Sequence, residues 1–156
     1  MILPLAHYGS AILRKKTAPI SDVTEEVINL IDDMKETLVA HNGLGLAAPQ
    51  VNRALRLFVI CIPLIDDNGD VIEEGTPEVF INPILSSPST EESVFNEGCL
   101  SIPGIYEEVT RPAEITVEAL NEKGETFSFR VSGLKAIAIM HENDHLNGML
   151  FIDRIK

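Results

Sequence analysis

The sequence contains few cysteines and no long apolar run. Its two cysteines, Cys61 and Cys99, are too few for a disulfide framework. The longest apolar run, Leu57 to Ile65, spans nine residues, whereas a membrane-spanning helix needs about 20. No basic residue precedes the apolar residues at the N-terminus, as one would in a secretory signal. We therefore expect a cytoplasmic protein in a reducing compartment, without a membrane segment.

Basic residues are scarce as well. Lysine and arginine together number 12 against 24 aspartates and glutamates, which gives a net charge of −12. An acidic surface repels the phosphates of nucleic acids and anionic lipids, so neither is expected as a direct ligand. Apolar residues make up 45% of the chain, which is typical of a globular protein. The length of 156 residues, without repeats or linkers, predicts one domain over residues 1–156.

The first predicted helix runs from about Asp22 to His41. Asp22 and Glu25 resemble a capping box at its start, and the dipeptide Asn42-Gly43 is suited to its end. Its apolar residues recur at helical spacing and form one stripe that faces the core: Val23, Val27, Leu30, Ile31, Met34 and Leu38. The next segment, Gly43 to Gln50, has two glycines and two alanines, which allow a backbone or a ligand to approach closely. It lacks the Gly-Lys-Ser/Thr ending of a phosphate loop.

Strands are predicted between this helix and a second one near the C-terminus. Their approximate ranges are 55–62, 79–85, 115–120 and 126–131. Asp66 to Asp70 predicts a solvated turn, because a calcium loop that starts at Asp66 would need a glutamate where Pro77 stands. The last helix is predicted from about Gly133 to Asn147, with Ser132 as its N-cap. The order of helix, strands and helix predicts an α+β fold.

The strongest chemical signal is His141-Glu142-Asn143-Asp144-His145, within the last predicted helix. Residues four apart share one helical face, so the imidazoles of His141 and His145 can reach one metal ion. Glu142 lies one residue round the helix, beside the metal, where it can take a proton from a metal-bound water. The alternative is two core histidines with a chance glutamate, and this spacing makes that a rare accident.

A metal site of this type needs a third protein ligand. One class of metalloprotease takes it from the last histidine of HExxHxxGxxH, but this chain has Gly148 followed by Phe151, which cannot bind a metal. Another class uses a glutamate well downstream, whereas Asp153 is the only carboxylate side chain after His145. The third ligand is therefore expected upstream.

Several upstream residues are candidates for this ligand. Besides many carboxylates, they are His7, His41, Cys61 and Cys99. Cys99 is favoured because a thiolate binds such metals strongly and the neighbouring Gly98 allows a close approach. Cys61 lies within an apolar run and is interpreted as a buried core residue. His7 and His41 are interpreted as surface residues.

Three separated motifs resemble the peptide deformylase family, and the resemblance spans nearly the whole chain. In order they are Gly43 to Gln50, Glu97 to Ser101 and His141 to His145, which are similar to the family's GxGxAAxQ, EGCLS and HExxH. The resemblance implies antiparallel strands packed around a central C-terminal metal-binding helix, an arrangement within the α+β class. It also implies an enzyme that removes the N-formyl group from formylmethionine at the start of newly synthesised polypeptides and releases formate.

The resemblance implies roles for individual residues. The implied metal ligands are Cys99, His141 and His145. They would hold one Fe²⁺ per chain, with water as the fourth ligand and with Zn²⁺ or Ni²⁺ able to occupy the site in purified protein. Glu142 is implied as the general acid and base. The side-chain amide of Gln50 and the backbone N–H of Leu100 are implied as donors to the formyl oxygen.

Contacts with the substrate are implied as well. Gly45 and Gly98 resemble positions whose backbones pair with an extended peptide. The implied lining of the methionine pocket is Leu44, Tyr106, Leu134, Ile137 and Ala138. Glu97 and Arg111 resemble a family ion pair that steadies the cysteine loop.

The implied partners are N-formylmethionyl peptides, and a monomer is expected. Many family members dock on the ribosome through a basic C-terminal helix, but this sequence stops at Lys156, so docking by that route is not expected. Two other functions stay open: a generic metalloprotease, and a non-catalytic relative that binds a metal or a peptide. The intact Glu142 and Gln50 argue against the second, because binding alone needs neither.

Overall fold

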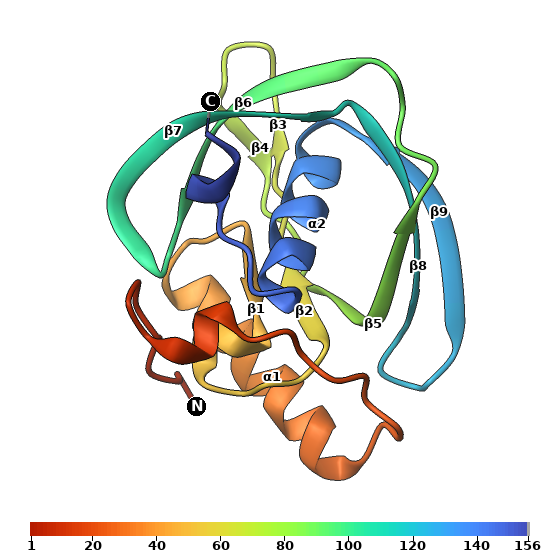
Figure 1. Ribbon diagram of the computed structural model, residues 1–156. Coiled ribbons are helices and arrows are strands. Elements are labelled where there is room, and N and C mark those ends of the chain that lie inside the picture. The colour runs from red at the N-terminus through yellow and green to blue at the C-terminus, as the bar shows by residue number, and fades with distance from the viewer. Residues whose placement is uncertain (156) are drawn as a thin grey trace.

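A five-stranded antiparallel sheet separates the two α-helices of the computed structural model, which describes residues 1–155 (Figure 1). The strand order is β1-β2-β5-β8-β9. The strands are β1 (Gly45–Ala47), β2 (Leu57–Ile60), β5 (Glu78–Ser86), β8 (Glu114–Leu120) and β9 (Thr126–Ser132). The helices are α1 (Glu25–Ala40) and α2 (Gly133–Leu146), and the short 3-10 helices are η1 (Ala11–Arg14), η2 (Ala48–Val51) and η3 (Phe151–Arg154).

Strand β2 is apolar throughout because both of its faces are covered. Phe58 and Ile60 pack in the cluster that surrounds α2, whereas Leu57 and Val59 pack in the cluster formed with α1. Successive side chains of a strand point to opposite faces, so a strand between two helices has no position for a polar side chain. The strand predicted over residues 55–62 is confirmed, although its regular part is shorter.

Helix α2 lies in the centre of the molecule, with strands on several sides and α1 below it in the view of Figure 1. Residues Ala136 to Met140 are buried, and the next two turns bury polar side chains, among them His141 and His145. A helix covered on nearly all sides brings its polar side chains into the interior, where they need partners. The predicted α+β fold around a central C-terminal helix is confirmed.

The starts of both helices differ in detail from the sequence prediction. Helix α1 begins at Glu25, and its N-cap is Thr24, whose side-chain oxygen accepts a hydrogen bond from the N–H of Val27. The predicted capping box of Asp22 and Glu25 is therefore wrong, because the helix begins only at Glu25 and Thr24 occupies the N-cap position in place of Asp22. In α2, Ser132 occupies the N-cap position but makes no side-chain capping bond.

Two hairpins were not predicted. The first joins β3 (Leu64–Ile65) and β4 (Val71–Glu73) across the predicted turn, whose Asp66 N–H donates to the Asp70 carbonyl at 2.9 Å. The second is a long pair, β6 (Glu92–Cys99) and β7 (Ile102–Pro112), which arches past α2 in Figure 1. Most of its side chains are exposed or half-buried, so it lacks the apolar alternation that reveals a strand in a sequence.

The helices of the described chain are all too short or too polar to cross a membrane.

Candidate metal centre and active site

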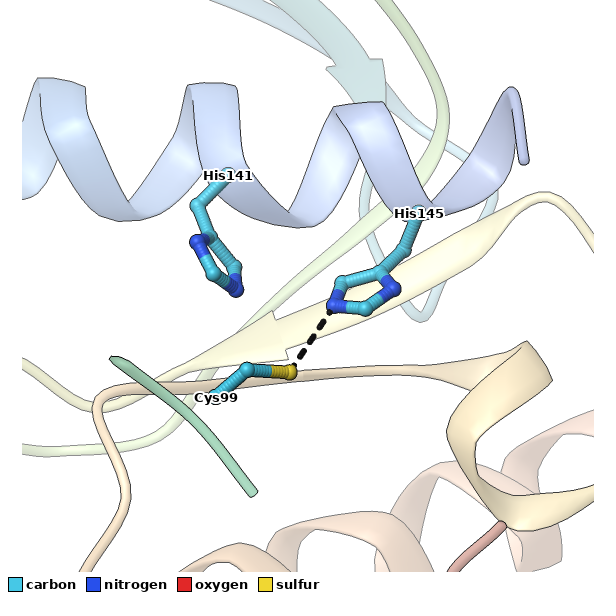
Figure 2. A group of neighbouring side chains, drawn as sticks. All are labelled: Cys99, His141 and His145. Carbon is cyan, nitrogen blue, oxygen red and sulfur yellow. Dashed lines mark hydrogen bonds between the residues drawn. The ribbon is translucent and has the colours of Figure 1, made fainter. Parts of the chain in front are cut away.

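Helix α2 directs the side chains of His141 and His145 to the same side, toward Cys99 at the end of β6 (Figure 2). The ligand atoms of these three residues all lie within 4.8 Å of one another. Sγ of Cys99 is 3.3 Å from Nε2 of His145. Both histidines are buried and Cys99 is half-buried. The structure thus brings together the three residues that the sequence suggested as metal ligands.

An irregularity in the β6–β7 hairpin places Cys99. The register is regular from Glu92 to Gly98 and shifts between Gly98 and Cys99, which lies opposite Ile102. Such a shift bends the strand and re-aims the side chain that follows it. Cys99 therefore turns from the hairpin toward the face of α2 that carries the histidines.

The ring of His141 is oriented by Glu97. Its Nδ1–H donates to Oε1 of Glu97 at 2.9 Å, and Glu97 in turn accepts two hydrogen bonds from Arg111, at 2.7 and 2.9 Å. Burial alone would raise the pKa of Glu97, but the bonds from Arg111 and His141 outweigh burial and lower it. Because Nδ1 is occupied, Nε2 of His141 is the nitrogen that remains for a metal.

The two rings differ in their tendency to bind a proton. Burial favours the neutral form of His141, but the charge of Glu142 and the contacts with Cys99 and Glu97 outweigh it and raise the pKa of His141 to about 10. Burial, with a smaller effect of the charges of His141 and Arg111, holds the pKa of His145 well below its usual value. His145 is therefore neutral, and a metal ion would compete with the proton of His141.

This donor set fits a divalent transition metal. It offers one cysteine sulfur and two imidazole nitrogens, a combination typical of zinc and iron sites with three protein ligands. The carboxylate of Glu97 behind His141 is the kind of outer partner that metal-binding histidines have. Nδ1 of His145 makes no hydrogen bond within the described residues.

Glu142 lies beside this group without joining it. Its Oε2 is 3.9 Å from Nε2 of His141, and its buried Oε1 has no hydrogen-bond partner within residues 1–155. Burial is the main cause that raises the pKa of Glu142 to about 7. A carboxyl group with such a pKa, next to a metal centre and at the wall of a cavity, is suited to proton transfer near neutral pH.

The backbone of β1 packs directly on Glu142. A Cβ added at Gly45 would lie 2.5 Å from Oε2 and 2.8 Å from Cδ of this carboxyl group. We expect Gly45→Ala to displace the carboxylate, leave the metal content unchanged and lower kcat about 100-fold, within the range that a general acid or base contributes. Kinetics together with metal analysis measure this effect. Gly69→Ala, a strained substitution in the distant β3–β4 turn, is the control for a general loss of stability. An unchanged kcat in Gly45→Ala would contradict the steric argument.

A cavity of about 520 Å³ opens in front of these groups. The residues predicted to contact the substrate all contribute to its walls: Leu44, Gly45, Gly98, Tyr106, Leu134, Ile137 and Ala138. Cys99, Leu100, His141 and Glu142 line it as well. The ring of Tyr106 covers Gly98, where an added Cβ would lie 2.4 Å from the ring. The cavity therefore combines apolar walls with the polar cluster at one end.

Gln50 lies behind Cys99 and is held by the chain around it. It follows β1 in η2, and its Oε1 accepts the N–H of Ala47 at 2.8 Å. Its Nε2 donates to Oγ of Ser101 at 3.1 Å and lies 3.4 Å from Sγ of Cys99. With only 1% of its surface exposed, the side-chain amide has a fixed orientation toward the metal group.

The other upstream candidates for the third ligand lie apart from the metal group. His7 and His41 are exposed at the mouth of the cavity, as predicted for surface residues. Cys61 is half-buried against the α1 cluster, so the prediction of a buried residue is wrong in degree. It follows the regular part of β2, where the chain begins to leave the core. Burial still raises the pKa of the Cys61 thiol, with smaller effects of Glu74 and Glu78.

Sequence reasoning missed three residues around the centre: Ser101, Asp144 and Arg154. Ser101 is fully buried and accepts the bond from Gln50. Asp144 is buried and accepts hydrogen bonds from Arg111 and Arg154. A charged residue inside the buried helix, next to His145, was a usable signal for Asp144. No local pattern marks Arg154, because its partner is ten residues earlier on another element.

Two histidines from a central helix and a cysteine from a β-hairpin form one possible metal site, and a glutamate lies beside it at the wall of a cavity. This arrangement is typical of a metallohydrolase. The sequence model of the polypeptide deformylase family matches residues 2–156. The chain therefore belongs to the peptide deformylase family, enzymes that remove the formyl group from N-terminal formylmethionine in a metal-dependent reaction.

Relatives and solved structures of this family resemble the chain over its whole length. The peptide deformylase of Cellvibrio japonicus is 43% identical over 155 residues, which are 99% of this chain and 86% of that protein. The crystal structure of the Thermotoga maritima peptide deformylase is 36% identical, with a TM-score of 0.89 over 100% of this chain and 99% of that one. A class I type b enzyme from Acinetobacter baumannii, in a crystal structure with Met-Ala-Ser bound, is 34% identical, with a TM-score of 0.91 over 99% of each chain.

Proposed function

We propose that Cys99, His141 and His145 hold one Fe²⁺ and that Glu142 is the acid and base that drives removal of the formyl group. The observation that carries this assignment is the position of Glu142. Its carboxyl group is buried at the cavity wall, next to the metal ligands, and one of its oxygens has no partner within the described residues. When bound, the metal would supply Lewis-acid chemistry that makes water a nucleophile near neutral pH.

Glu142 is the proposed general base and general acid for the two proton transfers of the reaction. With its pKa raised to about 7, the carboxyl group can accept a proton from the attacking water and then give it to the leaving amine. Oε2 lies 3.9 Å from Nε2 of His141, and the buried Oε1 has no hydrogen-bond partner within the described residues, so no protein contact competes for the proton on that oxygen. The close contact between the Gly45 backbone and Glu142 limits movement of the carboxyl group between the two transfers.

Two donors are proposed for the formyl oxygen as it gains negative charge. They are the side-chain amide of Gln50 and the backbone N–H of Leu100, the residue after Cys99. The Gln50 amide points at the metal group and is held by Ala47 and Ser101, so little reorganisation is needed when charge develops. Loss of one donor of this kind costs about 2.7–4 kcal/mol of transition-state stabilisation in comparable sites.

The peptide is proposed to bind as an added strand between β1 and β6. In the described chain β1 is the edge strand of the large sheet, and β6 pairs only with β7. Each therefore has one edge without a partner strand, at Gly45 and at Gly98, and both glycines line the cavity. The methionine side chain then extends along Leu134, Ile137 and Ala138 of α2.

We further propose that residues 1–156 act as one catalytic domain on nascent chains in the cytoplasm. The N-terminal segment is tied to the site, since the N–H of Ala6 donates to the carbonyl of Gln50 and that of Tyr8 to the carbonyl of Ser101. The family's substrate, a formylated N-terminus, arises during protein synthesis. Direct contact with nucleic acid is disfavoured by the net charge of −12.

One assay tests the proposed function. Protein loaded with Fe²⁺ under anaerobic conditions should release formate from formyl-Met-Ala-Ser, and metal-free protein should not. A formyl-norleucine peptide should be turned over nearly as well, because one methylene is worth about 1–3 kcal/mol in such a pocket. A formyl-Asp peptide should be poor, because its carboxylate would be desolvated without a partner. Cleavage of internal peptide bonds without formate release would identify a metalloprotease instead, and binding without turnover a non-catalytic relative.

A further inference from the structure

A continuous chain of ion pairs, buried except at Arg154, joins the C-terminal 3-10 helix η3 to the metal centre. Nε of Arg154 donates to Oδ2 of Asp144 at 2.6 Å, and its Nη2 donates to Oδ1 at 2.9 Å. The same Oδ2 accepts Nη1 of Arg111 at 2.9 Å. Arg111 donates two hydrogen bonds to the carboxylate of Glu97, and this carboxylate accepts a further hydrogen bond from Nδ1–H of His141. The contacts run from Arg154 to His141 without a gap.

The cluster formed by Arg154, Asp144, Arg111 and Glu97 is balanced in charge. It contains two guanidinium groups and two carboxylates, and Asp144, Arg111 and Glu97 are buried. Without Arg154 one carboxylate would be left in excess beside a metal ligand. Arg111 would then be the only cation facing both Asp144 and Glu97, so its hydrogen bonds to Glu97 would weaken. The orientation of the His141 ring depends on the position of Glu97 that these bonds maintain.

We propose that Arg154 is a positioning residue of the metal centre, which acts through Asp144, Arg111 and Glu97 to fix the ring of His141. This role goes beyond that of the Glu97–Arg111 pair alone, and it makes the C-terminal end of the chain a part of the active site. It rests on the proposed ligand set of Cys99, His141 and His145. Arg154 itself is far more accessible than its partners, with 39% of its side chain exposed. Its replacement therefore leaves little empty space in the core.

A second ion pair of η3 allows two roles to be tested separately: attachment of η3 to the rest of the chain, and orientation of the His141 ring. Arg14 of η1 contacts Asp153 through Nη1 at 2.5 Å and through Nη2 at 3.3 Å. This pair holds the same short helix, but it makes no contact with Asp144 among the interactions of residues 1–155. Loss of Arg14 should loosen η3 without disturbing the charge balance around Arg111. Arg14→Met is therefore the matched control for Arg154→Met.

The test uses the full chain loaded with Co²⁺ under anaerobic conditions. For each variant we would measure the visible spectrum of the bound ion, the rate of its transfer to a chelator and the melting temperature. Arg154→Met should change the Co²⁺ spectrum and speed metal release about tenfold, the lower end of the 10–100-fold effect of losing an outer partner of a metal ligand, because Arg154 acts on Glu97 only through Asp144 and Arg111. Arg154→Lys, which keeps the charge but not the two-pronged contact, should lie between Arg154→Met and the parent. Arg14→Met should leave the spectrum unchanged and the rate within about twofold, because an exposed pair contributes little.

Two outcomes would overturn the proposal. One is a spectrum and a release rate of Arg154→Met equal to those of the parent protein. The other is an equal acceleration in Arg14→Met and Arg154→Met, which would show that η3 only needs an anchor. If Arg154→Met does not fold, Arg154→Gln decides the question, since a spectrum and a release rate equal to those of the parent in a variant without the guanidinium charge would mean that Arg154 does not position the centre. Failure of the parent protein to give a thiolate-to-cobalt absorption band would instead contradict the ligand set.

Discussion

Replacing Glu142 by glutamine should leave metal binding intact and lower kcat for formate release by about 10²–10⁴-fold, the contribution typical of a general acid or base. The amide has nearly the shape of the carboxyl group, so it fills the same space against Gly45 and opens no cavity. It cannot accept a proton from water or pass one to the leaving amine. Metal analysis and steady-state kinetics of formate release measure the two effects separately.

A matched variant removes a carboxylate elsewhere. Glu118→Gln makes the same chemical change at an exposed position of β8 and should leave both kcat and metal content unchanged. Glu142→Ala, which removes the carboxyl group entirely, should be about as inactive as Glu142→Gln and should still bind metal. Loss of the metal together with activity in both Glu142 variants would mean that Glu142 is a ligand and that its proposed role is wrong.

Replacing Cys99 by serine should abolish stoichiometric metal binding at neutral pH. A serine hydroxyl stays protonated where a thiol can ionise, so it is a much poorer ligand for a divalent transition metal. We expect a loss of affinity larger than the 10–100-fold that follows removal of an outer partner. Metal content after dialysis against a weak chelator measures the loss, and activity should fall with it.

The other cysteine provides the control. Cys61→Ser makes the same substitution in a half-buried thiol that packs against the α1 cluster, away from the histidines. It should keep full metal content and activity, at a cost in stability of about 1–3 kcal/mol for a hydroxyl without a full set of partners. Full metal occupancy in Cys99→Ser would remove this residue from the centre and leave the third ligand unassigned.

The fold class could be predicted because local patterns determine the helices and several of the strands. The stripe from Val23 to Leu38 made α1 recognisable, and the continuous apolar run of β2 indicated a strand. The strands predicted over residues 115–120 and 126–131 are confirmed as β8 and β9, which span Glu114–Leu120 and Thr126–Ser132 and pair as a hairpin. The β6–β7 hairpin was missed because its side chains are mostly exposed, so its pairing depends on backbone hydrogen bonds that leave no periodic trace in the sequence.

The amino-acid sequence was sufficient to predict the part of the metal centre that lies on one helix. The positions of His141 and His145, four residues apart, follow from the helical repeat, and Glu142 follows with them. The metal-binding chemistry of the side chains limited the third ligand to a set of upstream residues and favoured Cys99, but it did not show which of them lies near the histidines. Cys99 comes from a hairpin more than 40 residues earlier, and its approach depends on the register shift after Gly98. Contacts between distant segments are decided by packing and strand pairing, which no short window of sequence contains.

The hydrogen bonds that orient the metal ligands depend on contacts that form only when the chain folds. The bonds from Arg154 through Asp144, Arg111 and Glu97 to His141 join residues from four elements, η3, α2, β7 and β6. Asp144 and Arg154 are ordinary charged residues in the sequence, where charges are usually solvated, and only the resemblance to the family linked Glu97 with Arg111. Burial changes the role of Glu97, Arg111 and Asp144, because a charge taken out of water must find a partner of opposite sign, and the fold alone determines which partner lies within reach.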